Sequence, residues 1–548
     1  MAIMYAFQLS SQEKVFLDYT LPQQEYSHIS ALKNERFSYQ IAFRSELHHE
    51  ADNLLRVSIE SPLKEVVSVR KVGNVPVEMA VWTAYDEHYE RVTPGMYPDV
   101  LYPMENNATE INALWHSLWI TVDLNGKISA GNYPITIILT CGKEVIRKTL
   151  QVEIIDAMLP AQEMKVTQWF HTDCIANYYR VPVFSEFHWE MIEKFMRTAA
   201  ENGINMILTP IFTPPLDTEV GGERTTVQLL DIEQDGETYW FGFEKLRRWI
   251  GIAKRCGIKY LEMAHLFTQW GLAATPKIVA TVNGEEKRIF GWDVSSEDPA
   301  YKNFLSQMLP QLHNVLVEEG MDKNTFFHIS DEPQAAHIER YKKLKTMVSE
   351  FLPGYIFMDA LSNFEFYREG AVDCPIPASN DIEPFIEHQV PGLWTYTCCG
   401  QCKDVSNRFM SMPSYRTRVI GIQFYKFDVV GFLQWGYNFY NSCLSRKQVN
   451  PFVVTDCIGV YPAGDAFSVY PGEDGALESL RIVVFYEGLQ DVRALKLLEQ
   501  YIGKEKVVGI IEEMAGMEIR FDKYPHDKNF LLALRERVNQ EIKKCVEK

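Results

Sequence analysis

The sequence lacks long apolar runs and a surplus of positive charge. No stretch of about 18 apolar residues occurs in its 548 residues, so no membrane-spanning helix is predicted and no membrane partner is expected. Only 54 Lys and Arg residues stand against 73 Asp and Glu residues, a net charge of −19. Nucleic-acid-binding proteins usually carry a basic face, so nucleic acid is not an expected partner either. The first residues show no basic segment followed by an apolar core and a small-residue cleavage site, which favours a cytoplasmic location.

Cysteine-based and cofactor-binding motifs are also scarce. Ten cysteines in a chain of this length do not make a disulfide scaffold. Cys398, Cys399 and Cys402 cluster, but a zinc site would need a second ligand pair at similar spacing, and the sequence has none. The G-x-G-x-x-G, Walker and G-x-S-x-G patterns are missing. We therefore expect packing thiols, and no metal or cofactor.

The composition that remains is that of a globular protein of more than one domain. Apolar residues make up 46% and charged residues 23% of the chain, which excludes wholesale disorder. A chain of 548 residues is too long for one ordinary domain.

Residues 1–160 read as a sheet domain. Apolar and polar residues alternate with a period of two in segments 118–124, 133–140 and 150–155. Asn125-Gly126, between the first two segments, is a tight-turn signal. No long helical pattern interrupts this region, so we predict an antiparallel β-sandwich.

From about residue 165 short apolar strands alternate with helices. Ser185 is a predicted N-cap of a helix that ends at Gly203, and a second helix ends at Gly257. The predicted strands are 166–170, 204–208, 260–263, 325–330, 355–358, a weak one near Val372, 393–397 and 429–435. Eight such units predict a (β/α)8 TIM-type barrel over residues 161–475, with an open doubly wound sheet as the alternative. Residues 476–548 are predicted to form a C-terminal helical segment packed on the barrel.

Two long loops of the barrel contain turn signals between strand-like runs. Asp235-Gly236 lies in one and Asn283-Gly284 in the other. We expect two hairpins that project from the C-terminal rim and build walls of an active-site pocket, since barrel active sites lie at that rim. Decorative loops are the alternative.

The segment with the clearest chemistry is 326–333, an apolar strand that runs into Asp331 and Glu332. Neighbouring acids raise one another's pKa when they are buried together, which is best tolerated where a reaction uses them. The alternative is a helix N-terminus, where acidic residues suit the helix dipole.

Glycoside hydrolysis usually needs two carboxyl groups, one to protonate the leaving oxygen and one to act as nucleophile or base. In many barrel glycosidases the acid follows strand four and the nucleophile ends strand seven. Here strand seven ends in residues 394–399, which contain no carboxylate. The other plan is substrate-assisted: a 2-acetamido group of the sugar attacks the anomeric carbon, and the enzyme supplies an acid/base and a carboxylate that orients the amide. Adjacent Asp331 and Glu332 suit that division of labour.

Several segments in order resemble glycoside hydrolase family 123, the β-N-acetylgalactosaminidases. The resemblance covers roughly residues 80–500. It is carried by Asp331-Glu332-Pro333, 394–398, 431–436, Tyr461-Pro462, Tyr470-Pro471-Gly472, Ser479-Leu480-Arg481 and 487–491, and in the sheet domain by Tyr97-Pro98-Asp99, Trp119 and Gly131-Asn132-Tyr133. The family implies retention of configuration through an oxazolinium-type intermediate. By the resemblance, Asp331 orients and polarises the acetamido group and Glu332 is the general acid/base.

Other side chains near predicted strand ends are candidates for sugar contacts. Tyr396 is a candidate hydrogen-bond donor to the acetamido carbonyl, and Trp394 and Trp435 are candidates for an apolar wall. The remaining candidates are Trp169, His171, Asp173, His265 and Asp359. For each of these residues the alternative is a structural role, in packing or in hydrogen bonding to backbone groups, and His328 is expected to be structural.

We therefore predict a retaining, exo-acting β-N-acetylgalactosaminidase that acts on oligosaccharides or glycoconjugates with a terminal β-linked N-acetylgalactosamine. Two alternatives remain: a glycosidase of other sugar specificity on the same scaffold, and a non-catalytic carbohydrate-binding protein. If the chain is catalytic, both carboxyls should face one cavity with Tyr396 and the tryptophans. The oligomeric state is not predicted.

Overall fold

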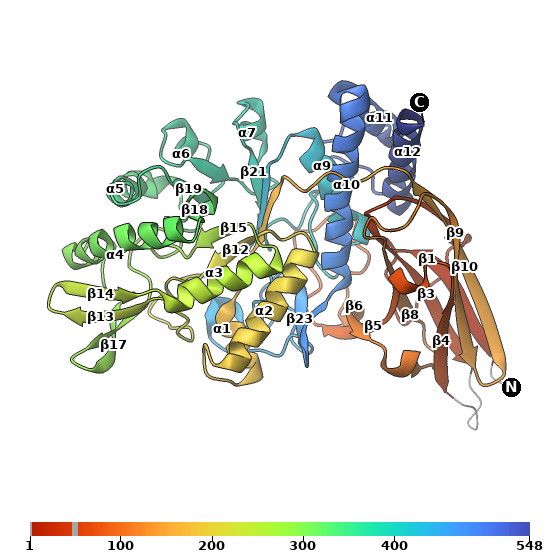
Figure 1. The fold of residues 1–548 in the computed structure, drawn as a ribbon, viewed down its shortest axis with the longest axis horizontal. Coiled ribbons are helices and arrows are strands. Elements are labelled where there is room, and N and C mark those ends of the chain that lie inside the picture. Colours follow the sequence, from red (N-terminus) through yellow and green to blue (C-terminus); the bar gives the residue numbers. More distant parts are fainter. Residues whose placement is uncertain (1–2, 47–52, 548) are drawn as a thin grey trace.

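A computed structural model describes residues 3–46 and 53–547 and shows three regions (Figure 1). A sheet-rich N-terminal region lies at one end, a nearly closed barrel of parallel strands with helices at the other, and C-terminal helices between and above them. Within the described ranges, none of the helices combines the length and apolar character that crossing a bilayer requires.

The N-terminal region consists of two five-stranded sheets. One has the order β1-β3-β8-β5-β6 and the other β2-β10-β9-β4-β7. The strands are β1 (Ile3–Ser10), β2 (His28–Leu32), β3 (Arg36–Glu46), β4 (Leu54–Glu60), β5 (Val67–Val77), β6 (Gly95–Pro103), β7 (Ala108–Glu110), β8 (His116–Asp123), β9 (Gly131–Cys141) and β10 (Glu144–Ile155). Their pairing is antiparallel except that β2 runs parallel to β10, a departure from the predicted antiparallel sandwich.

The period-two pattern produces the core between the two sheets. On β8, Leu118, Ile120 and Val122 are buried in the same apolar cluster as Ile135 and Ile137 of β9. The predicted turn at Asn125-Gly126 forms with positive φ at both residues. It carries the chain from one sheet to the other, because β8 and β9 belong to different sheets.

The barrel has eight parallel strands in the order β20-β19-β18-β15-β12-β11-β22-β21. They are β11 (Lys165–Gln168), β12 (Met206–Thr209), β15 (Tyr260–Met263), β18 (Thr325–Phe327), β19 (Ile356–Ala360), β20 (Cys374–Ile376), β21 (Trp394–Thr397) and β22 (Gly431–Gln434). Between the end strands β20 and β21, a parallel bridge joins Ala378 to Tyr396 and nearly closes the barrel. Each predicted strand overlaps an observed one or, for the weak sixth strand, lies next to it.

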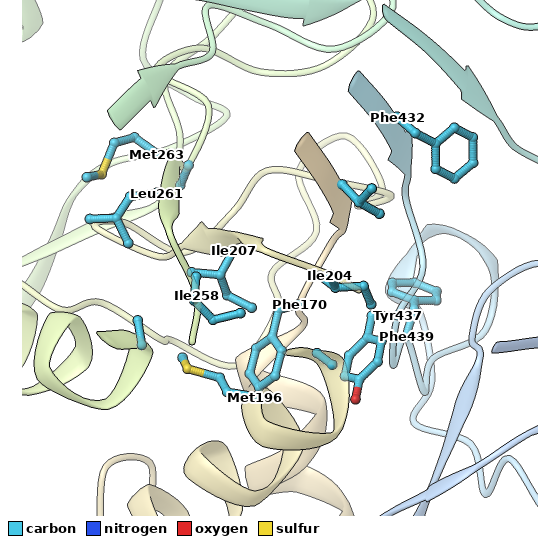
Figure 2. Packing of buried hydrophobic residues seen from close by; sticks show 14 of the residues in the cluster. Phe170, Met196, Ile204, Ile207, Ile258, Leu261, Met263, Phe432, Tyr437 and Phe439 are labelled. Carbon is cyan, nitrogen blue, oxygen red and sulfur yellow. The ribbon is translucent and has the colours of Figure 1, made fainter. Parts of the chain in front are cut away.

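Strands of this barrel are buried on both faces. On β12, Met206 and Leu208 belong to the inner cluster, whereas Ile207 packs on the outside beneath the helices. Figure 2 shows Ile207 among outer residues such as Leu261 of β15 and Met196 of the covering helix α2. Helices of this region are α1 (Thr172–Tyr179), α2 (Glu186–Glu201), α3 (Glu244–Cys256), α4 (Pro299–Glu318), α5 (Ile338–Ser349), α6 (Glu365–Arg368), α7 (Glu383–Glu387), α8 (Ser414–Arg418) and α9 (Ile420–Lys426).

Two predicted helix boundaries rest on side-chain and glycine chemistry. The Ser185 hydroxyl accepts a hydrogen bond from the backbone N–H of His188 and caps α2. Gly257 follows α3 with φ of +90°, a conformation that suits glycine because it has no Cβ.

The two predicted hairpins form, but they do not line the pocket described below. They are β13 (Asp231–Asp235) with β14 (Thr238–Gly242), and β16 (Ile278–Val282) with β17 (Glu285–Phe290). They join into one four-stranded sheet whose aromatic side chains pack on Phe304 of α4. The prediction that the hairpins build walls of the active-site pocket is therefore wrong. Their apolar faces pack against α4 instead.

The C-terminal helices are α10 (Leu480–Ile502), α11 (Lys504–Ala515) and α12 (Lys528–Val546). Helix α10 stands between the barrel and the sandwich (Figure 1). A short hairpin of β23 (Val469–Gly472) and β24 (Gly475–Glu478) precedes it.

Buried ion pairs join α10 to the sandwich and to its helical neighbours. The guanidinium of Arg481 on α10 donates to both carboxylate oxygens of Asp99 on β6, at 2.8 and 2.9 Å. Arg418 of α8 makes a similar double contact with Asp491 of α10. Because a buried charge without a partner is costly, these pairs fix how the regions meet.

We expect Arg481→Met to lower the free energy of unfolding by about 3–5 kcal/mol, because it leaves the Asp99 carboxylate buried without its cation. Denaturant unfolding followed by fluorescence measures the loss. The matched control is Arg147→Met: its partner Glu60 and the arginine are both exposed, and such a pair contributes about 0–1 kcal/mol. Equal unfolding midpoints for the two variants would contradict the assignment.

Candidate active site

Asp331 and Glu332 lie just past the C-terminal end of β18. The next helical turn begins at Ala335, with Gln334 as its N-cap, so neither carboxyl group caps a helix. Glu332 has a φ of +45°, which is unusual for a residue with a Cβ. Hydrogen bonds hold this segment on both sides: the Glu332 N–H donates to the Ala360 carbonyl at 3.0 Å, and the Asp331 carbonyl accepts from the Trp270 N–H at 2.9 Å. Such conformations persist where the surroundings impose them, often at functional sites.

Both carboxyl-bearing residues line one cavity of about 90 Å³ with Tyr396, Trp169 and Trp435. The remaining lining residues are Leu216, Asp217, Gln269, Trp270, Ala360, Cys398, Cys399, Leu433 and Tyr461. They follow the C-terminal ends of different barrel strands, where barrel active sites are built. The geometry expected of a catalytic pair is therefore present.

The surroundings of the pair favour the protonated form of Asp331. Burial and the neighbouring charge of Glu332 raise the pKa of Asp331 well above that of an ordinary carboxyl. The Tyr396 hydroxyl donates to Oε1 of Glu332 at 2.7 Å. Burial, reinforced by Glu332, raises the pKa of Tyr396 as well, so it remains a neutral donor. The cavity thus holds one carboxyl, Asp331, that keeps its proton to a higher pH than an ordinary carboxyl does.

A third carboxylate, Asp217, lines the cavity from the loop after β12. Its Oδ1 accepts from the Tyr461 hydroxyl at 2.8 Å and its Oδ2 from the Leu444 N–H at 3.0 Å. Sequence reasoning missed it, although its position after predicted strand two was a usable signal. No carboxylate enters from β21, where Cys398 and Cys399 follow the strand.

The two tryptophans of the cavity are held at their polar tips. The indole N–H of Trp435 donates to Oδ2 of Asp465 at 2.9 Å, and that of Trp169 donates to Oε1 of Glu262 at 2.6 Å. Each ring is therefore presented to the cavity in a fixed orientation. Flat apolar rings of this kind suit the apolar face of a sugar or a methyl group.

Five of the predicted contact residues lie outside the cavity lining. Trp394 is buried in the barrel interior. Its ring lies against Gly431, where a Cβ would come within 2.0 Å of the ring atoms. His171 binds the Trp435 carbonyl at 2.8 Å, and Asp173 forms a buried ion pair with Arg224. Both residues therefore support the segment that carries Trp435 and do not line the cavity.

The other two of the five, His265 and Asp359, are fully buried and contact His328. The ring of His265 stacks on that of His328 with centroids 4.2 Å apart, and Asp359 accepts from Nδ1 of His328 at 2.9 Å. Residues that were not predicted to contact the sugar line the cavity instead: Asp217, Gln269, Trp270, Cys398, Cys399 and Tyr461. They lie in loops, whose positions local sequence patterns do not specify.

Two groups of side chains in the described residues have the spacing of a metal site, and one of them, His265, His328 and Asp359, is buried. Ligand atoms of His265, His328 and Asp359 lie within 4.8 Å of one another. However, both ring nitrogens of His328 already bind carboxylates. The two histidine rings are also nearly parallel, at 16°, so their in-plane lone pairs do not converge on one ion. The trio does not fit a metal.

A larger cavity of about 510 Å³ lies near the opposite ends of the strands. It is lined by residues 160–165, by Asp428, Val429 and Val430 ahead of β22, and by part of α10. These positions precede β11 and β22, at the barrel end that contributes to stability. We place the chemistry in the smaller cavity, which contains the paired carboxyls.

Comparisons with known proteins bear on the family of the chain. A family model described as "Glycoside hydrolase 123, catalytic domain" matches residues 169–498. No curated protein sequence matches the chain. A solved family 123 glycoside hydrolase from Clostridium perfringens, described in a study of glycolipid glycan hydrolysis, has a TM-score of 0.75 and 14% identity, covering 99% of this chain and 98% of that one.

Other solved structures are more distant. A β-glucuronidase from Parabacteroides merdae has a TM-score of 0.31 and 11% identity over 88% of this chain and 51% of its own, too low to carry an argument. The family match spans more than half of the chain and contains Asp331 and Glu332. The protein therefore belongs to glycoside hydrolase family 123 and is a glycoside hydrolase.

Proposed function

We propose that this protein is a retaining, exo-acting β-N-acetylgalactosaminidase that uses the 2-acetamido group of its substrate as the nucleophile. The observation that carries the proposal is the pair of adjacent carboxyls, Asp331 and Glu332, facing one small cavity with Tyr396 while no carboxylate enters from β21. This arrangement supplies an acid and an orienting carboxylate.

In the first step the acetamido oxygen forms a bond to C1 of the sugar as the bond from C1 to the leaving oxygen breaks. Asp331 accepts a hydrogen bond from the amide N–H and stabilises its developing positive charge, and Glu332 gives its proton to the leaving oxygen. In the second step Glu332 takes a proton from water, the hydroxyl attacks C1, and the acetamido group is released. Tyr396 helps to orient Glu332 through its hydrogen bond.

The substrate assignment rests on family membership and on the size of the cavity. The cavity is too small to enclose several consecutive sugars, which supports exo action. Trp169 and Trp435 offer apolar surfaces for the acetyl methyl and the sugar face. The Clostridium perfringens relative is described as hydrolysing glycolipid glycans, which makes glycoconjugates with a terminal β-linked N-acetylgalactosamine the first substrates to try.

Asp217 gives a specific reason for a second candidate mechanism. As a third carboxylate in the cavity, it is a possible enzymic nucleophile in a two-carboxylate mechanism with Glu332 as the acid. We favour substrate assistance because both oxygens of Asp217 accept hydrogen bonds from protein groups. A different hexosamine specificity remains the alternative at the level of substrate. The binding-protein reading loses support, since neither acid caps a helix.

Aryl β-N-acetylgalactosaminide should be hydrolysed at least about tenfold faster than aryl β-N-acetylglucosaminide, measured as kcat/KM. We expect Asp331→Asn to lower kcat/KM by about 10²–10³-fold. Glu332→Gln should lower it by about 10²–10⁴-fold for poor leaving groups, and by less for a dinitrophenyl leaving group that needs no proton.

Matched controls for these variants are Asp381→Asn and Glu339→Gln, which change exposed carboxyls. Both should behave like the wild-type enzyme. Hydrolysis of neither aryl sugar by the wild-type enzyme would refute the proposed substrate, and full activity in Asp331→Asn would refute the proposed role of that residue.

The identity of the nucleophile can be read from substrates with fluorinated acetamido groups. If the acetamido oxygen attacks C1, kcat should fall steeply with each added fluorine, because fluorine withdraws electrons from that oxygen. Asp217→Asn should keep this steep dependence, as should the control Asp381→Asn. A flat dependence on fluorine, together with loss of activity in Asp217→Asn alone, would favour Asp217 as the nucleophile.

The kcat/KM profile should be bell-shaped, because the pair must hold one proton. Activity should be lost on the alkaline side as the pair gives up that proton. Since burial and Glu332 raise the pKa of Asp331, the alkaline limb should lie well above the ordinary carboxyl value of about 4. Initial rates from pH 3 to 10 measure it, with enzyme returned to the optimal pH to exclude irreversible loss. An alkaline limb near pH 4–5 would contradict the shared proton.

A further inference from the structure

Beneath the acid pair lies a chain of three charged groups that the proposed reaction does not use. His328 is the middle member, three residues before Asp331 in the sequence. Its Nε2 lies 2.6 Å from Oε1 of Glu262, and its Nδ1 lies 2.9 Å from Oδ1 of Asp359. All three side chains are fully buried, at 0% exposure. A ring with a carboxylate at each nitrogen is best satisfied as an imidazolium that donates both protons.

Each carboxylate of this chain holds a different part of the active site. Glu262 accepts from the indole N–H of Trp169, a wall of the cavity, at 2.6 Å. It also accepts from the Thr167 hydroxyl at 2.6 Å on β11, a strand separated from that of Glu262 by β12. One end of the chain therefore fixes the orientation of the tryptophan that faces the sugar.

The other end fixes the backbone that leads into the acid pair. Asp359 accepts from the N–H groups of Ile329 and Ser330 at 3.2–3.3 Å. The Tyr341 hydroxyl of α5 donates to the same carboxylate at 2.5 Å. The segment that positions Asp331 is thus tied to the helix behind it through a single carboxylate.

His328 is the positively charged member of the chain Glu262–His328–Asp359. Burial alone would lower the pKa of His328, but the hydrogen bonds and charges of Asp359 and Glu262 outweigh it and raise that pKa to about 10. The stacked neighbour His265 is different: burial and the charge of His328 lower its pKa well below 6.5, and neither of its ring nitrogens has a hydrogen-bond partner in the described structure. It covers the imidazolium with a neutral ring.

We propose that His328 is a positioning residue whose ring, bound to a carboxylate at each nitrogen, locks Trp169 and the Ile329–Ser330 backbone through Glu262 and Asp359 and provides the cation that balances the Asp331–Glu332 pair. The inference rests on the proposed function for its kinetic part. Charged and titratable groups that act on Asp331 or line its cavity include Glu332, His328, Asp359, Asp217, Tyr396, Tyr461, Cys398 and Cys399, and His328 is the cation among them. Removing its charge makes ionisation of the pair harder.

Kinetics should report this charge directly. In His328→Gln, both limbs of the kcat/KM profile with aryl β-N-acetylgalactosaminide should move to higher pH by about one unit, so kcat/KM on the acidic limb falls about tenfold. His328→Gln leaves two buried carboxylates without their cation, so it can fail to fold. Glu262→Gln with His328→Gln removes one negative and one positive charge together and keeps the net charge of the chain, and it should show a smaller shift in the same direction, because loss of the Glu262 charge partly offsets loss of the cation.

The matched control is His188→Gln. His188 is also buried, but its ring nitrogens bind backbone groups of Phe184 and Thr172. This control should leave both limbs in place. A folded double variant whose activity falls equally at every pH, with unmoved limbs, would reduce His328 to a packing role and overturn the proposal.

A second measurement needs no substrate. Histidine-selective ¹⁵N labelling of the full-length protein allows the ring nitrogens of His328 to be followed, with assignment by their loss in the double variant. We expect an imidazolium signal that persists from pH 6 to pH 9 in the wild-type protein and begins to change at lower pH in Glu262→Gln. A His328 ring that titrates near pH 6.5 would overturn the proposal. If the wild-type enzyme hydrolyses no aryl hexosaminide, the proposed function fails, and this measurement still decides the state of His328.

Discussion

Two carboxyl groups on neighbouring residues, Asp331 and Glu332, are partly removed from water, and their charges repel each other. Much of the barrel's polar interior is arranged so that it offsets this unfavourable electrostatic energy. Burial and the charge of Glu332 raise the pKa of Asp331, so this carboxyl keeps its proton to a higher pH than an isolated carboxyl does. Tyr396 supplies a neutral donor to one carboxyl, and buried His328 supplies a positive charge nearby. The left-handed conformation of Glu332 is imposed by backbone hydrogen bonds to neighbouring segments. The carboxyls that we propose to react and the unusual backbone conformation therefore occur at the same place, residues Asp331 and Glu332.

The N-terminal sandwich contributes to the site although none of its residues lines the cavity. Residues 79–82 reach across to the loop that carries Tyr461 and Asp465. The Met79 N–H donates to Asp456, and the Trp82 indole N–H donates to the Val460 carbonyl at 2.8 Å. Asp99 binds Arg481, whose guanidinium also donates to the Gly464 carbonyl. Through these polar contacts the sandwich thus supports the loop that orients Trp435.

A barrel glycosidase without a carboxylate at the end of its seventh strand must obtain its nucleophile elsewhere. Here that strand delivers Tyr396 and then two thiols, Cys398 and Cys399. The pKa of the Cys398 thiol is raised, with burial opposed by its hydrogen bond to Cys399, so it is a poor nucleophile. Small neutral thiols and fixed indole rings suit an apolar acetyl group better than they suit covalent catalysis.

Local sequence patterns were sufficient for much of this protein. Period-two alternation indicated the sheets, glycine and serine marked the ends of α2 and α3, and Asp331 and Glu332 stood out because adjacent acids at a strand end are costly. Side chains that depend on long-range contacts were not accessible in this way. His265 and Asp359 were predicted to face the sugar and instead pack against His328, and Trp394 fills the space over Gly431. Asp217, Trp270 and Tyr461 reach the cavity on loops whose paths depend on contacts with distant segments. The sequence by itself determined which strand carries the acids, since that depends on neighbours in the chain; only the tertiary structure decided which charges and rings surround them, since those come from strands far apart in sequence.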